Sequence, residues 1–194
     1  MKAIYAEHLA GHRALFAQLD GLAPLVEAAG ARLAAALAAG GSVWLAGNGG
    51  SAADAQHIAA EMEGRLERER PARAVHSLAA NGSTLSSVGN DYGFEAIFAR
   101  QIAGFVRPGD LVVLISTSGR SPNLLRAAEA ARERGIGVIG LLGKGGGPLA
   151  ALCEIAIVVP SEDTQWIQEA HALVGHVLCK LIDRLLPGPP PAGA

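Results

Sequence analysis

From residue 42 onward, short runs of aliphatic and β-branched residues alternate with longer segments of helical periodicity. The apolar runs are continuous, without the polar alternation of a half-exposed strand. Such strands, separated by helices, are typical of a parallel sheet covered by helices on both faces. The sequence therefore predicts an α/β three-layer sandwich with a five-stranded parallel sheet. The expected strands are 42–46, 74–78, 111–115, 137–142 and 155–159, and the expected helices are 51–66, 82–103, 121–134, 147–152 and 163–186.

The residues before this alternation, 4–39, have the pattern of two helices separated by a break at Gly21 and Pro24. The second helix, 25–38, consists mostly of alanine and leucine, so we expect it to be buried on more than one side. Because a monomer would expose this apolar patch, we expect residues 1–40 to lie in an oligomer interface. The simpler alternative is that both helices only cover the sheet.

The composition excludes several classes of protein. A hydrophobic fraction of 50% excludes a disordered chain, and a net charge of −2 without a basic run argues against a nucleic-acid-binding protein. The sequence shows neither a signal peptide nor a membrane span, and Cys153 and Cys179 lack metal-site spacing, so we expect buried free thiols. These features predict a cytoplasmic protein with a single domain over 1–187 and a disordered tail at 188–194.

Many of the 25 glycines gather at the predicted carboxyl ends of strands. Gly47, Gly49 and Gly50 follow the first strand and Gly119 follows the third. Open parallel sheets bind ligands at this edge. Aromatic residues make up only 4% of the chain, which suits a site that holds a hydroxylated ligand through backbone amides and hydroxyls. The glycine positions therefore indicate a binding site at the carboxyl edge of the sheet.

The loop after the first strand, AGNGGS at 46–51, leads directly into a predicted helix. Glycines allow close approach of the backbone, and a helix N-terminus offers free N–H groups to an anion. The loop lacks the GK[ST] ending of a P-loop and the GxGxxG pattern, which disfavours a nucleotide. The alternative is a tight turn in which Ser51 is an ordinary N-cap.

The loop after the third strand, ISTSGRS at 115–121, carries four hydroxyl side chains within six residues. Neutral donors next to a helix N-terminus can surround one phosphate, with Ser121 as the N-cap and Pro122 as the first helical residue. The alternative is a solvated turn rich in serine and threonine. Four hydroxyls beside a buried strand favour an anion site.

Two helices carry candidate metal or acid–base groups. His57 and Glu61 are four residues apart and therefore share a helix face, although such a pair is often only a surface hydrogen bond. In the last helix, His171 and His176 lie about 140° apart around the axis, on either side of Gln168. They cannot easily serve one site, and helix position alone does not choose between them. Either histidine could instead be a core or interface residue.

Taken together and in order, these motifs resemble the sugar isomerase (SIS) domain and, within it, the phosphoheptose isomerase family. The matching segments are GNGGSAADAQHIAAEMEGR, GNDYGFE, STSGRSPN and IQEAHALVGHVLCKLID, and the resemblance extends over about residues 4–186. It implies the SIS fold plus two N-terminal helices. It also implies a homotetramer with active sites between subunits and one zinc ion per subunit. The net charge and the lack of a membrane span, noted above, predict no nucleic-acid or membrane partner.

The resemblance also assigns site residues. It implies that Glu61 and His176 are the catalytic pair, which resolves the ambiguity between His171 and His176. The implied metal ligands are His57, Glu61, Gln168 and His176. The implied substrate-binding residues are Asn48, Gly49, Gly50, Ser51, Glu61, Asn90, Asp91, Ser116, Thr117, Ser118, Ser121 and Gln168. Gln165 and Trp166 depart from the residues that often precede the Ile-Gln-Glu run in the family.

The implied activity converts sedoheptulose 7-phosphate to D-glycero-D-manno-heptose 7-phosphate, toward the heptoses of lipopolysaccharide. Aldose–ketose exchange through an enediolate needs a base, an acid and charge stabilisation. The principal alternative is a non-catalytic SIS tetramer that binds the bacterial replication initiator, in which residues such as serine and asparagine replace the catalytic pair. Because Glu61 and His176 are both present, the enzyme is favoured. An isomerase that serves a capsule or antibiotic heptose pathway is a further alternative.

Overall fold

A computed structural model describes residues 2–186, and the predicted disorder of 188–194 lies outside the described residues. Its centre is a parallel sheet with the strand order β2-β1-β3-β4-β5, so the predicted α/β sheet is confirmed. The strands begin and end within one residue of the predicted bounds. They are β1 (Val43–Gly47), β2 (Val75–Ser77), β3 (Leu111–Ser116), β4 (Gly137–Leu142) and β5 (Ile155–Val158).

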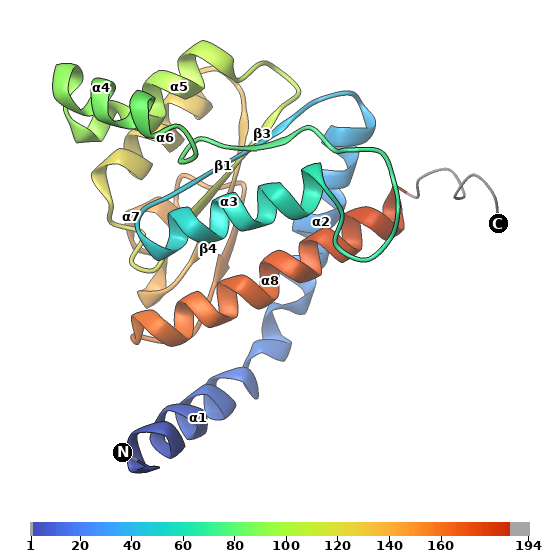
Figure 1. The fold of residues 1–194 in the computed structure, drawn as a ribbon, viewed down its shortest axis with the longest axis vertical. Coiled ribbons are helices and arrows are strands. Elements are labelled where there is room, and N and C mark those ends of the chain that lie inside the picture. The colour runs from blue at the N-terminus through green and yellow to red at the C-terminus, as the bar shows by residue number, and fades with distance from the viewer. Residues whose placement is uncertain (1, 187–194) are drawn as a thin grey trace.

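Helices cover both faces of the sheet (Figure 1). The central strand β3 shows how its residues divide between the two layers. Leu111, Val113 and Ile115 face one layer, whereas Val112 and Leu114 face the other. The first layer contains α2 (Ala23–Ala38), α3 (Gly50–Glu63) and α8 (Thr164–Leu185). The second contains α4 (Gly82–Tyr92), α5 (Ile97–Phe105), α6 (Pro122–Glu133) and α7 (Gly147–Ala150).

One predicted helix is wrong in its extent. The segment 82–103 was expected to be a single helix, but it forms α4, a 3₁₀ turn at Phe94–Ala96 and then α5. Gly93 separates them with a φ of 86°, a left-handed conformation that ends a helix and that glycine adopts at little cost. Asn90 and Asp91 therefore lie in the last turn of α4 and not within a continuous helix.

The N-terminal segment forms α1 (Lys2–Phe16), a 3₁₀ turn at Leu19–Leu22 and α2. Figure 1 shows α1 extending away from the sheet, and the side chains of Ile4 and Tyr5 are exposed. The expectation that 25–38 is buried on more than one side is wrong for the isolated chain. One face of α2 packs on the sheet layer, whereas Leu25 and several alanines remain exposed.

The segment Leu19–Ala38 is long and apolar enough to span a membrane by length and composition. A core helix of a water-soluble protein can pass the same test, and a single such segment is weak evidence. Val26, Ala29 and Leu33 are buried in the same cluster as residues of the sheet and of α8. This packing accounts for the apolar residues on one face of α2 and leaves the apolar residues of its exposed face without contacts to the sheet layer. Cys153 and Cys179 are both free thiols, and Cys179 is buried whereas Cys153 is partly exposed.

Candidate functional site

The loops after β1 and β3 diverge at the carboxyl edge of the sheet. The two strands are neighbours, but β1 leads into α3 on one face and β3 leads into α6 on the other. Ligands of open parallel sheets bind at such a switch point. A pocket of about 300 Å³ lies there. It is lined by Asn48, Gly49, Gly50, Ser51, Ile115, Ser116, Thr117, Ser118, Ser121, Thr164 and Gln168.

Most of these lining residues were predicted from the two loop motifs, and Gln168 from the family resemblance, but Ile115 and Thr164 were not singled out as site residues. Thr164 is the first residue of α8, following the N-cap Asp163. A hydroxyl at the start of a predicted helix was the available signal, and it is weak because such residues are common helix-start residues. The structure thus adds a third helix N-terminus to the walls of the pocket.

The β1 loop depends on glycine at its closest contacts. Gly49 is the N-cap of α3 with a φ of 54°, so the alternative that Ser51 is the N-cap is wrong. Ser51 instead lies buried in the first turn of α3. A Cβ on Gly47 would lie 2.5 Å from the backbone carbonyl oxygen of Ser51, which cannot move aside as a side chain can, so the loop needs glycine there. Gly50 faces the side-chain amide of Gln168, and this contact brings α3 and α8 together at the pocket.

The β3 loop presents hydroxyls around the N-terminus of α6. Ser121 is the N-cap and Pro122 begins the helix, as expected. Ser116 Oγ accepts a hydrogen bond from the Gly119 N–H at 3.0 Å, and Ser118 Oγ accepts one from the Arg120 N–H at 3.3 Å. Because each hydroxyl accepts in these bonds, its own proton stays available for an anion.

A pair of amides joins the two loops. Asn48 Nδ2 donates to Asn123 Oδ1 at 2.9 Å, and Asn123 Nδ2 donates to Asn48 Oδ1 at 2.8 Å. Asn123 is buried in the first turn of α6. Sequence reasoning did not single it out, because its partner is 75 residues away along the chain. The pair holds the Asn48 side chain in one orientation at the rim of the pocket.

Three side chains of metal-ligand type meet on α3 and α8. His57, Glu61 and His176 each offer one ligand atom, and these atoms lie within 4.8 Å of one another. His57 Nε2 lies 3.2 Å from Glu61 Oε1, and the rings of His57 and His176 are 5.1 Å apart. Two imidazoles and one carboxylate suit zinc. The donor set therefore fits the metal that the sequence resemblance implied.

One further carboxyl group lies beside this cluster. Asp54 precedes His57 by one helical turn, and its Oδ2 is buried without a hydrogen-bond partner among residues 2–186. Burial raises the pKa of Asp54 above its ordinary value, and the charge of His57 opposes that change. Sequence reasoning missed Asp54, since an aspartate in a polar helix carries no signal until its neighbours are known.

The structure separates His171 from His176. His171 is fully buried, and its ring nitrogen Nε2 donates to the carbonyl oxygen of Leu142 at 3.1 Å. Burial lowers the pKa of His171 to about 4, although the hydrogen bond to Leu142 opposes the change. His171 is thus a neutral core residue, whereas His176 faces α3.

This burial predicts a pH-dependent stability. His171 titrates near 6.5 when unfolded and about 4 when folded, so the unfolded chain binds the extra proton between these values. We expect its contribution to the free energy of unfolding to be complete above pH 6.5 and to fall by up to about 1.4 kcal/mol per unit as the pH drops toward 4. Urea unfolding of wild type and His171→Gln from pH 7 to about 4 measures this. If the free energy of unfolding changed with pH equally in the two proteins, the prediction would be contradicted.

The cluster of His57, Glu61 and His176 does not include three other predicted site residues, Gln168, Asn90 and Asp91. Gln168 lines the pocket, eight residues and about 12 Å along the axis from His176. Asn90 and Asp91 are exposed at the end of α4, where Asn90 Nδ2 donates to Asp91 Oδ1 at 2.8 Å. Within residues 2–186, neither is among the residues that line the pocket.

The pocket and the metal-type cluster lie along one seam between α3 and α8, which run side by side (Figure 1). Gly50 meets Gln168 at the pocket end, and further along Gly175 meets Ile58, where a Cβ would lie 2.6 Å from Ile58 Cδ1. His57 follows Gly50 by about 10 Å of helix. The seam can therefore hold an anion at one end and a reacting group further along.

This chain is similar to known proteins over most of its length. The SIS domain family matches residues 7–143. The phosphoheptose isomerase of Rhodospirillum rubrum is 53% identical over 171 residues, which cover 88% of this chain and 91% of the relative. That of Solidesulfovibrio magneticus is 50% identical over 184 residues, covering 95% and 89%. The structure of the phosphoheptose isomerase from Neisseria gonorrhoeae matches with a TM-score of 0.89 at 38% identity, covering 94% of this chain and 98% of that one.

Proposed function

Because the chain belongs to the phosphoheptose isomerase family of SIS-domain proteins, we propose that it converts sedoheptulose 7-phosphate to D-glycero-D-manno-heptose 7-phosphate. The observation that carries this proposal is the seam itself, with a hydroxyl-lined pocket at one end and the His57, Glu61 and His176 group further along. An extended sugar phosphate can bridge such a separation, whereas a three-carbon substrate is too short.

The phosphate is held in the pocket by neutral donors. Ser116, Thr117, Ser118 and Ser121 offer hydroxyl protons, and the N-terminus of α6 adds N–H groups and a positive dipole end. Asn48, with the loop glycines and Ser51, binds the hydroxylated part of the chain. This arrangement agrees with a nearly neutral protein that has no need of a basic patch.

The proton transfer is assigned to Glu61 and His176. Glu61 removes a proton from C1 of the ketose and returns it to C2, so that an enediolate forms and collapses to the aldose. His176 moves the proton that leaves the C1 hydroxyl to the C2 oxygen. Each proton taken up is given back, and no other reactant is needed.

His57, Glu61 and His176 would hold zinc. Gln168, the fourth ligand that the family resemblance implies, lines the pocket at the other end of the seam in this chain and does not lie with these three residues. Bound zinc would supply a Lewis acid that polarises the carbonyl group. Glu61 can accept a proton only when its carboxylate is free of the metal. Activity with and without a chelator therefore bears directly on the role of this carboxylate.

The test is incubation of the purified protein with sedoheptulose 7-phosphate, with chelator or added zinc, while aldose formation is followed. We expect aldose in at least one of these conditions. Its absence in all of them would overturn the proposal. A pull-down with the replication initiator serves as the comparison, and we expect no capture, because the chain keeps Glu61 and His176. The product would enter heptose biosynthesis for lipopolysaccharide in the cytoplasm.

We also propose a homotetramer that buries α1 and the exposed face of α2. Ile4 and Tyr5 are exposed on α1, and Leu25 is exposed on α2. Asn90 and Asp91 lie outside the pocket lining described for their own subunit, which supports active sites completed between subunits.

Two histidines of α1 contact Glu169 of α8 and hold α1 in its orientation. His8 Nε2 lies 2.8 Å from Glu169 Oε1, and His12 contacts the other oxygen. Burial raises the pKa of Glu169, but the hydrogen bonds with His12 and His8 outweigh it, so this pKa lies below its ordinary value. The carboxylate is thus charged at neutral pH and can hold α1 in place.

We expect light scattering at micromolar concentration to give four times the mass of one chain. Replacement of both Ile4 and Tyr5 by glutamate should give a smaller species, because charges would enter an apolar interface. Glu7→Gln, on the same helix, is the matched control and should remain a tetramer. A monomeric wild type would contradict the proposal.

A further inference from the structure

We propose that Arg70 is a positioning residue that holds Glu61 opposite His176 by joining the C-terminal end of α3 to α8. The inference rests on the proposed function, which assigns the proton transfer to these two side chains. Arg70 lies in the segment between α3 and β2, and its side chain is only 2% exposed. It does not line the pocket at the other end of the seam.

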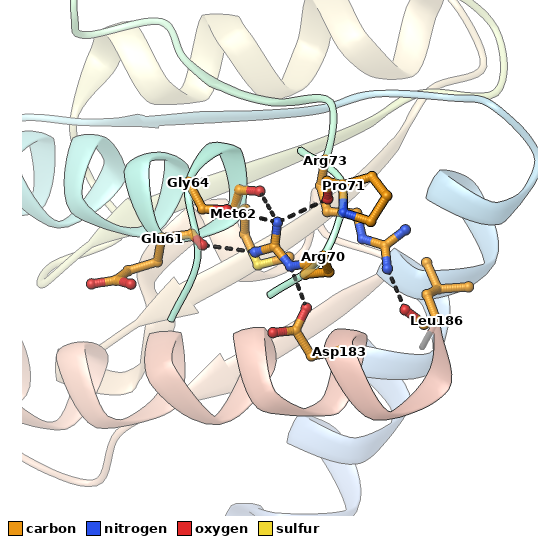
Figure 2. Close-up of polar contacts among 8 residues, drawn as sticks. All are labelled: Glu61, Met62, Gly64, Arg70, Pro71, Arg73, Asp183 and Leu186. Atoms are coloured by element: carbon orange, nitrogen blue, oxygen red, sulfur yellow. Dashed lines mark hydrogen bonds and ion pairs between the residues drawn. The ribbon is translucent and has the colours of Figure 1, made fainter. Parts of the chain in front are cut away.

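Arg70 binds the backbone of the helix that carries Glu61 (Figure 2). Nη2 donates to the carbonyl oxygen of Glu61 at 2.8 Å, and Nη1 donates to those of Met62 at 2.7 Å and Gly64 at 3.0 Å. It also donates to Pro71 at 3.1 Å. One guanidinium thus contacts the residue proposed as the base and the turn that follows it.

These carbonyls explain why an arginine is suited to this place. The last carbonyls of a helix have no N–H partner within the helix, and its C-terminal end carries partial negative charge. The planar guanidinium has five N–H donors in a fixed arrangement and can satisfy several carbonyls at once. A lysine would keep the charge but could not reproduce this set of directions.

The other contact of Arg70 is on α8. Its Nε donates to Asp183 Oδ1 at 2.8 Å, and Asp183 is itself largely buried. Asp183 follows His176 by seven residues, which is about two turns, so both lie on the same face of α8. Arg70 therefore links the backbone of Glu61 to the face of α8 that carries His176.

A purely stabilising role is the competing explanation, because a buried ion pair can matter for folding alone. The two roles differ in what they change. Loss of positioning lets the end of α3 shift against α8, which should lower kcat and weaken zinc binding in protein that is still folded. A purely stabilising role would lower only the melting temperature.

The experiment compares Arg70→Lys and Asp183→Asn with Lys180→Met. Lys180 pairs with Glu67 at 2.6 Å, so it joins the same segment to α8, but both side chains are about half exposed. For each variant we would measure kcat, KM, melting temperature and zinc affinity, the last by competition with a chromogenic chelator. Asp183→Asn keeps the shape of the pair, so it remains informative if Arg70→Lys does not fold.

We expect Arg70→Lys to lower kcat and zinc affinity about tenfold each, with KM changed less than about threefold, since residues that orient metal ligands from behind have effects of this size. Asp183→Asn should change the same quantities less, and Lys180→Met should match wild type. Unchanged kcat and zinc affinity in folded Arg70→Lys, with only a lower melting temperature, would overturn the proposal. An inactive wild type would overturn the proposed function, while the zinc measurement would still decide the role of Arg70.

Discussion

The Glu61→Gln protein is expected to turn over sedoheptulose 7-phosphate about a thousandfold more slowly than wild type, because general acid–base catalysis contributes about 10²–10⁴-fold. Glutamine keeps the size of the side chain but cannot accept the proton. KM should change only a few-fold, since the phosphate is held in the pocket at the other end of the seam. Steady-state kinetics would separate these two effects.

His176→Gln should give a similar loss, because both groups act in the same proton transfer. Glu63→Gln is the matched control. Glu63 lies on the same helix and its Oε1 lies 2.9 Å from His76 Nδ1, but that pair is exposed at the surface. The control should retain turnover within about twofold, because a surface pair of this kind contributes little. Turnover close to wild type in Glu61→Gln or His176→Gln would show that the assignment of the acid–base pair is wrong.

Gly119→Ala is expected to destabilise the protein and to weaken substrate binding. Gly119 has a φ of 60°, and a Cβ there would lie 1.8 Å from the carbonyl oxygen of Gly146. Because that neighbour is backbone, the clash cannot be relieved by a side-chain rotation. We expect a loss of about 3–4 kcal/mol in the free energy of unfolding from left-handed strain and overpacking together. KM should rise by about tenfold or more, since the loop carries Ser116, Thr117 and Ser118 and each lost charge-assisted hydrogen bond weakens binding.

Gly135→Ala is the control that measures the cost of left-handed backbone strain without a steric clash. Gly135 has a φ of 69°, and among the described residues nothing lies within 4 Å of the place where its Cβ would stand. It should lose only about 1–2 kcal/mol and keep its KM. Urea unfolding and steady-state kinetics on both variants would test this. Equal losses of stability in the two proteins would contradict the role given to the Gly146 contact.

Several parts of this protein could be predicted from local sequence alone. The apolar runs predicted the parallel sheet, because a strand buried on both faces has no polar alternation. The loops at 46–51 and 115–121 were predicted to bind a ligand, because parallel strands bring their carboxyl ends to one edge. The pocket is lined by residues of both loops. These features depend on short segments and on a general rule of topology.

Other features depended on contacts between distant segments. Sequence position could not choose between His171 and His176, since this choice depends on how α8 is rotated against the sheet and α3. The contact of Gly175 with Ile58 shows that rotation. Arg70 was not singled out, because its partner Asp183 is 113 residues away.

The sequence by itself determined the order of the elements, the parallel sheet and the two loops that line the pocket, because these follow from periodicity and from residue types within short segments. Only the tertiary structure decided that His57, Glu61 and His176 meet, that Arg70 joins α3 to α8, and that α1 leaves the body of the chain. The physical reason is that helix rotation and helix contacts are set by packing between residues far apart in the chain, which no local pattern records.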